Sequence, residues 1–159
     1  MQKQERKMNF FKEKCYIKVS NMAGYKYILF SVFASVIVAC IMATIEERFS
    51  VSSQNIATQN IILVIFIGPY VETLVLVCVI SILKKIIKKK IIVILMVDFI
   101  FTQLHTVSIL SKVCVFFMMF LAMYGYLVHE SKRISPFMKM YVIHAAYNGS
   151  LVILSQVTK

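Results

Sequence analysis

Four polar side chains that can exchange protons or donate hydrogen bonds lie inside apolar segments of this sequence: Glu72, His105, His144 and Asn148. A carboxylate can act as a general base towards water, and the N–H groups of an imidazole or an amide can stabilise a developing oxyanion. His144 and Asn148 are four residues apart, which places both on one face of a helix. These residue types suit general-base chemistry, with Glu72 as the base and Asn148 and His144 as the donors.

Glu72 lies in an apolar run, 61–83, that is long enough to cross a bilayer. A charged side chain at membrane depth is costly and normally faces the protein interior, where it has a functional partner. Pro69, three residues earlier, removes a helical backbone hydrogen bond. We therefore expect Glu72 to have a buried polar partner, and Gly68 and Pro69 to open the helix towards water or a substrate backbone.

Composition places the chain in a membrane. It has 159 residues, 60% of them hydrophobic, and a formal net charge of +11, whereas soluble domains are about 45–50% apolar. The basic residues lie in blocks between the apolar runs, as in loops beside an anionic membrane surface, and form no basic stripe interleaved with exposed aromatic residues. We expect an anionic lipid bilayer as a partner and no nucleic acid. The Lys- and Ile-rich composition favours a bacterial plasma membrane.

The expected fold is all-α, a polytopic membrane helix bundle of about five transmembrane helices. A basic arm, 1–24, in the cytosol or on the membrane surface precedes a single membrane-embedded domain, 25–159. With a cytosolic amino terminus, fifteen of the 18 basic residues fall on the inner side, in agreement with the positive-inside rule. The five predicted spans are about 25–44, 61–83, 91–110, 113–128 and 136–157.

Polar residues share single faces of two of these spans. In the third, Asp98, Thr102 and His105 are separated by steps of four and three residues. At about 1.5 Å of rise per residue, Glu72, His105, His144 and Asn148 lie roughly 10–21 Å from the inner ends of their helices. They can therefore converge in one layer of the bilayer. The alternative is that these groups only hold helices together by hydrogen bonds.

Three motifs in this order resemble the CAAX protease and bacteriocin-processing family of intramembrane proteases, also called the Abi or CPBP family. They are Pro69-Tyr70-Val71-Glu72, Phe101 with His105 four residues later, and His144 with Asn148 four residues later. The resemblance covers residues 66–155. It implies an endopeptidase that cleaves small membrane-associated, prenylated or peptide substrates.

Carried over from the family, Glu72 is the general base and His105 holds and polarises the attacking water. His144 and Asn148 then stabilise the oxyanion. Glu72, His105 and His144 could also form a zinc site with an open fourth position. A metalloprotease mechanism and metal-free activation of water both stay open. The HExxH signature of soluble metalloproteases is absent from the sequence.

The chain departs from the family in its first motif. Thr73 stands where a second Glu is usual, and Val77 where an Arg is usual. This motivates an alternative function, a catalytically inactive relative that acts in bacteriocin immunity or as a membrane partner protein. A third reading is a small transporter subunit in which Glu72 and the histidines relay protons.

Overall fold

The computed structural model describes residues 22–48, 60–105, 107–131 and 133–157. All but the last three residues of the expected arm, 1–24, lie outside this part of the chain. Every regular element within it is a helix. The elements are α2 (Gly24–Arg48), η2 (Leu63–Ile67), α3 (Gly68–Ile86), α4 (Lys90–Leu104), α5 (Ile109–Leu127) and α6 (Pro136–Val157).

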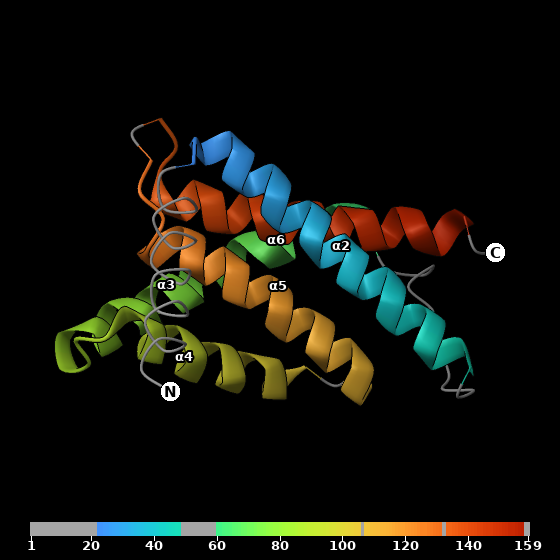
Figure 1. Ribbon diagram of the computed structural model, residues 1–159, viewed down its shortest axis with the longest axis horizontal. Coiled ribbons are helices and arrows are strands. Elements are labelled where there is room, and N and C mark those ends of the chain that lie inside the picture. The colour runs from blue at the N-terminus through green and yellow to red at the C-terminus, as the bar shows by residue number, and fades with distance from the viewer. Residues whose placement is uncertain (1–21, 49–59, 106, 132, 158–159) are drawn as a thin grey trace, which may run out of the picture.

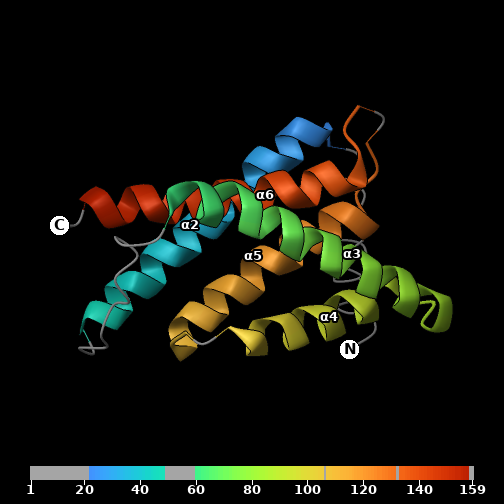
Figure 2. The same cartoon turned by 180° about the vertical axis from the view of Figure 1, so that it is seen from behind.

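Consecutive helices run back and forth between two ends of the bundle (Figures 1 and 2). α2 and α6 begin, and α3 and α5 end, at the end that also holds the turn from α3 to α4. α5 lies in the middle of the packing, in contact with α2, α4 and α6. α3 packs on α4 and α6, so it forms the outer wall on one side. The predicted all-α bundle is confirmed.

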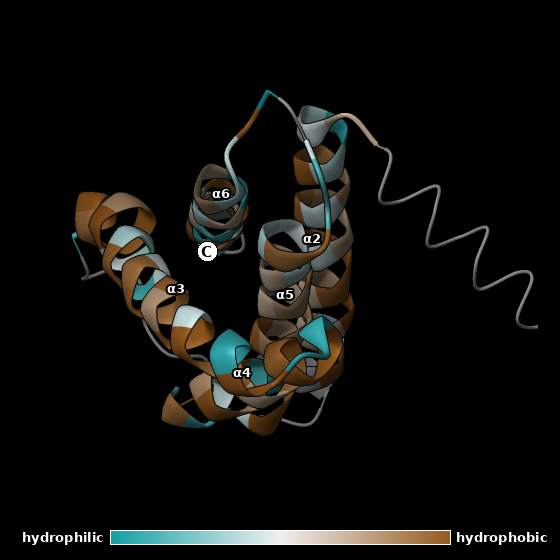
Figure 3. Cartoon of the chain, turned by 90° about the vertical axis from the view of Figure 1, so that its left-hand side faces the viewer, coloured by the Kyte–Doolittle hydropathy of each residue, from teal (hydrophilic) through white to brown (hydrophobic). Residues whose placement is uncertain are grey.

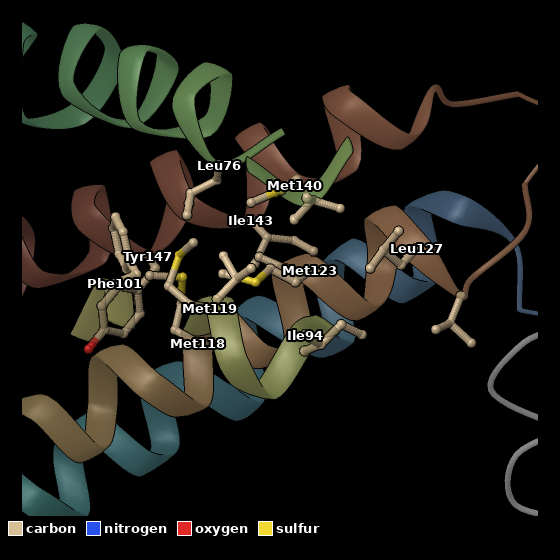
Figure 4. Close-up of a cluster of buried hydrophobic side chains, with 14 of the residues drawn as sticks. Leu76, Ile94, Phe101, Met118, Met119, Met123, Leu127, Met140, Ile143 and Tyr147 are labelled. Atoms are coloured by element: carbon tan, nitrogen blue, oxygen red, sulfur yellow. The ribbon is translucent and has the colours of Figure 1, made fainter. Parts of the chain in front are cut away.

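The core between α3, α4, α5 and α6 is rich in methionine (Figure 4). Met118, Met119, Met123 and Met140 are all at most 1% exposed. They meet aliphatic and aromatic side chains of the neighbouring helices: Leu76, Ile94, Phe101, Ile143 and Tyr147. Long unbranched thioether side chains fill the irregular space between helices that cross at different angles.

Small residues bring α2 close to its neighbours. Ser31, Ser35 and Ala39 recur every four residues and are buried, so they form a stripe along one face of α2. Such stripes let helix backbones approach closely in membranes. At the start of α2, Tyr27 lies against Gly125 of α5 and its hydroxyl donates a 2.6 Å hydrogen bond to the Leu121 carbonyl oxygen.

Three of the helical segments are long and apolar enough to cross a membrane: Gly24–Ile45, Leu63–Ile86 and Ile109–Leu127. The chain is therefore a membrane protein. α4 has 15 residues, about 22 Å of helix, which is shorter than a hydrocarbon core of about 30 Å. α6 is longer, but polar side chains interrupt it. Figure 3 shows apolar residues along the helices and hydrophilic ones at the α3–α4 turn.

The predicted end of the third span is wrong. α4 stops at Leu104 rather than continuing to residue 110, and α5 already begins at Ile109. His105 has an extended backbone, with φ −81° and ψ 121°, so it does not share a helical face with Asp98 and Thr102. The reason is local: Ser108 caps α5, and its side-chain oxygen accepts a hydrogen bond from the Ser111 N–H at 3.2 Å.

The sequence around Pro69 also departs from a regular helix, as expected. The turn before it, η2, is a π-helix in which the Gly68 N–H donates to the Leu63 carbonyl oxygen five residues back. Such single wide turns occur inside α-helices, frequently at functional sites. Pro69 then occupies the first turn of α3, where its fixed φ is accommodated. The wide turn directly precedes α3, the helix that bears Glu72.

Candidate functional site

Glu72 and His144 lie opposite each other at the contact between α3 and α6. The His144 Nε2 is 3.4 Å from the Glu72 Oε2. This exceeds the usual N–H···O distance of about 2.9 Å, so the two groups are in close polar contact but do not form a tight hydrogen bond. The His144 side chain is 4% exposed and the Glu72 side chain 41%. The carboxylate is therefore held by a buried imidazole on one side and open on the other.

His105 is the third member of the cluster. It lies just after α4 and is close enough to Glu72 and to His144 to interact electrostatically with both. Its Nδ1 is 3.0 Å from the Phe101 carbonyl oxygen. Because a carbonyl oxygen can only accept, Nδ1 carries a proton, and in the neutral imidazole Nε2 then has the lone pair. In that form His105 presents an acceptor, although it reaches the site from a helix end and not from a helix face.

Aromatic rings from α3, α4 and α6 pack around the site. The Phe101 ring centroid is 4.6 Å from that of His105 and 6.3 Å from that of His144. Tyr70 makes edge-to-face contacts with Phe137 and Tyr141 of α6. The imidazoles are thus fixed by ring packing, and α3 is joined to α6 beside the carboxylate.

Asn148 lies one turn beyond His144 and contacts η2. Its Nδ2 donates to the Val64 carbonyl oxygen at 3.1 Å. The structure therefore brings Glu72, His105 and His144 together and places Asn148 beside the wide turn. An amide NH₂ has two N–H donors, so Asn148 has a second N–H beside the one bonded to Val64.

Several polar atoms near the site have no hydrogen-bond partner of good geometry among the described residues. They are the His144 Nδ1, the Thr73 hydroxyl, both Asp98 carboxyl oxygens and the Thr102 hydroxyl. Thr73 and Asp98 are fully buried. Thr73 stands where the resembled family has a carboxylate, and Val77, where it has a guanidinium, is only partly buried among apolar residues. Glu72 therefore lacks both of these supports.

The predicted zinc set does not form a coordination site in this conformation. No group of three His, Cys, Asp or Glu side chains within residues 22–48, 60–105, 107–131 and 133–157 is arranged to hold a metal ion. The His144 Nε2 faces Glu72, and one nitrogen of His105 is bonded to the Phe101 carbonyl. A zinc site of Glu72, His105 and His144 therefore stays a prediction.

A second polar cluster, which the sequence did not reveal, lies at the end where α2 and α6 begin. His129 stacks on Tyr27, with ring centroids 4.3 Å apart. Its Nε2 is 2.9 Å from the Met22 carbonyl oxygen, and its Nδ1 is 3.2 Å from the Lys139 Nζ. Lys139 also donates to the His129 carbonyl oxygen. Lys139 reads as one more basic loop residue in the sequence, yet it is 1% exposed.

Next to this cluster is a pocket of about 290 Å³. The start of α2 and the α5–α6 connection line it, with Glu130, Ser131 and Arg133 as its polar residues. It is separate from the Glu72 site, since none of its lining residues belongs to α3, α4 or α6.

Comparisons with protein-family models, with curated proteins and with solved structures found no match to this chain.

Proposed function

We propose that the protein is an intramembrane endopeptidase in which Glu72, His105 and His144 activate water. The observation that carries this proposal is the contact between the Glu72 carboxylate and the buried His144 imidazole. A carboxylate that is open on one side, next to two imidazoles and inside apolar helices, suits proton abstraction from water. The order of the motifs, which resembles that of the CPBP family, supports the same reaction.

In the proposed reaction, the Glu72 carboxylate takes a proton from a water molecule whose oxygen attacks the scissile carbonyl carbon. His105 accepts a hydrogen bond from the same water at its Nε2. The His144 N–H turns from the neutralised carboxyl group to the oxyanion. Glu72 then passes its proton to the leaving amine nitrogen.

The proposed substrates are peptides or membrane-protein segments that reach the α3–α6 contact from the bilayer. The half-exposed carboxylate is the point of access. We place the protein in a bacterial plasma membrane with a cytosolic amino terminus. The lysine-rich α3–α4 turn then faces the anionic headgroups of the inner leaflet.

The test is peptide cleavage by the purified protein in lipid, with wild type, Glu72→Gln and Glu72→Ala. Loss of a general base typically slows a reaction about 10²–10⁴-fold, and we expect a loss in this range. Glu130→Gln is the matched control, because Glu130 is an exposed carboxylate in the α5–α6 connection. Full activity of both Glu72 variants would refute the assignment.

The second candidate function is a catalytically inactive relative that confers bacteriocin immunity or binds a membrane partner. The observation that favours it is the missing support for Glu72, since Thr73 is buried without a hydrogen-bond partner in the described structure. Protection or partner binding that survives the combined substitutions Glu72→Ala, His105→Ala and His144→Ala would establish this function instead.

A further inference from the structure

Pro69 leaves one carbonyl group of the wide turn without a backbone partner. In a π-helix, the Val64 carbonyl oxygen would accept from the N–H of residue 69, but proline has none. The α-helical alternative is the Gly68 N–H, which already donates to Leu63. A carbonyl group in apolar surroundings must find another donor or lose the free energy of a hydrogen bond.

Asn148 supplies that donor from another helix. Its Nδ2 is 3.1 Å from the Val64 oxygen. The bond ties α6 to η2, which precedes α3 directly, and it lies one helical turn from His144. The two ends of the Glu72–His144 contact are therefore attached to each other a second time, through Val64 and Asn148.

We infer that Asn148 is a positioning residue, whose bond to Val64 sets the wide turn and so aims Glu72 at His144. This inference rests on the proposed function for its effect on catalysis. The one amide N–H that the structure shows in use is bonded to Val64 and not directed at Glu72 or His144. Asn148 then matters mainly because Pro69 creates the unpaired carbonyl.

The inference makes the two residues interdependent. Restoring an N–H at position 69 gives the Val64 oxygen a backbone donor and makes the Asn148 amide dispensable. Asn148→Ala alone should lower kcat about 100-fold, the loss that a misplacement of about 1 Å can cause, with little change in KM. Pro69→Ala combined with Asn148→Ala should recover at least about tenfold of that kcat.

Controls lie on the same helix. Gly149→Ala adds a methyl group whose nearest neighbour is the Ile65 side chain at 3.7 Å, an ordinary contact. Ser150→Ala removes a hydrogen bond that stays within α6, from the Ser150 hydroxyl to the Ala146 oxygen. Both should keep the wild-type kcat. Pro69→Ser restores the same N–H and replaces Pro69→Ala if that variant does not fold.

A double variant as slow as Asn148→Ala would overturn the inference, because Asn148 would then act on the reacting atoms directly. The peptidase proposal would survive that result. If wild type cleaves no peptide, the proposed function fails, and wild type, Pro69→Ala, Asn148→Ala and the double variant are compared by thermal unfolding in detergent. A smaller loss of Tm from Asn148→Ala in the Pro69→Ala background supports the bond to Val64, and an equal loss in both backgrounds refutes it.

Discussion

Gly125 and Gly149 both lie inside helices of the bundle, but a methyl group has opposite consequences at the two residues. At Gly125 an added Cβ would stand 2.7 Å from the Cε1 of Tyr27. That ring is 1% exposed, stacks on His129 and is hydrogen-bonded to Leu121. It has no room to retreat, so the absence of a side chain at Gly125 is what lets α2 approach α5.

We predict that Gly125→Ala lowers the free energy of unfolding by about 1–3 kcal/mol, the usual cost of overpacking. Gly149→Ala should be neutral or stabilising by up to about 1 kcal/mol, because alanine favours the helix. Thermal or denaturant unfolding in detergent measures both. Equal stability of the two variants would show that the Tyr27 ring can move aside.

Residue-level prediction from the sequence succeeded where a polar group stands alone in an apolar run. Glu72 and His144 were expected to meet because a carboxylate in such surroundings needs a partner, and they lie 3.4 Å apart. Whether they perform catalysis stays a prediction. The contacts of Lys139 with His129 and of Asn148 with Val64 were not predicted, because both depend on how separate elements pack and not on spacing within one helix.

At the scale of elements, the connection between α5 and α6 is held by a neutral histidine. The His129 Nε2 donates to the Met22 carbonyl, so its Nδ1 carries no proton and can accept from the Lys139 ammonium group. Burial lowers the pKa of His129 below its ordinary value of 6.5, and the nearby Lys139 charge lowers it further. Tyr27, Tyr124 and Glu130 are the other titratable groups around this cluster.

This lowered pKa makes stability depend on pH. Below about pH 6.5 the unfolded chain binds a proton at residue 129 that the folded protein does not. We predict that the contribution of His129 to stability is fully present above pH 6.5 and is lost as the pH falls, with a slope of at most about 1.4 kcal/mol per pH unit. Unfolding measured from pH 5 to 8 tests this prediction.

His129→Gln is the informative variant for this measurement. It removes the titrating group, so its stability should fall less steeply than that of wild type between pH 6.5 and 5. The other two histidines are unchanged in it, and the difference between the two curves belongs to residue 129. Parallel curves would contradict the assigned proton positions.

The helices themselves were largely predictable, because five apolar runs separated by charged or polar segments have few alternatives to helices in a membrane. The boundary between α4 and α5 was predicted too late, because Lys112 is the charged residue of this region and Ile109 and Leu110 before it are apolar. Ser108 decides it by capping α5, and a serine three residues before a second serine is a weak signal in the sequence. An irregular turn beside Pro69 was expected from the sequence, but its π-helical form at 63–67 was not.

At the scale of the whole molecule, one end of the bundle is rich in exposed lysine. Lys84, Lys85, Lys88, Lys89 and Lys90 surround the α3–α4 turn and are all exposed. This turn lies at the same end as the starts of α2 and α6 (Figure 1). The arrangement agrees with the alternation that the positive-inside rule predicts, and it makes the orientation in the membrane testable at two positions.

We predict that a cysteine at Lys88 faces the cytosol and that one at Asn60 faces the outside. Each is introduced singly into a chain whose four native cysteines are replaced. A membrane-impermeant thiol reagent applied to intact cells should label Asn60→Cys and not Lys88→Cys, and should label both after permeabilisation. The reverse pattern on intact cells would place the amino terminus outside.

The methionines in the core also have a mechanical consequence. Met118, Met119 and Met123 of α5 face Met140 of α6, and each side chain rotates about three bonds. A core of branched side chains resists a small displacement of a helix because it opens voids, but thioether chains can rotate to refill them. α3, which contacts this core through Leu76, can therefore shift slightly while the interior stays packed. The core that contacts α3, the helix that bears Glu72, therefore adapts to small movements of that helix.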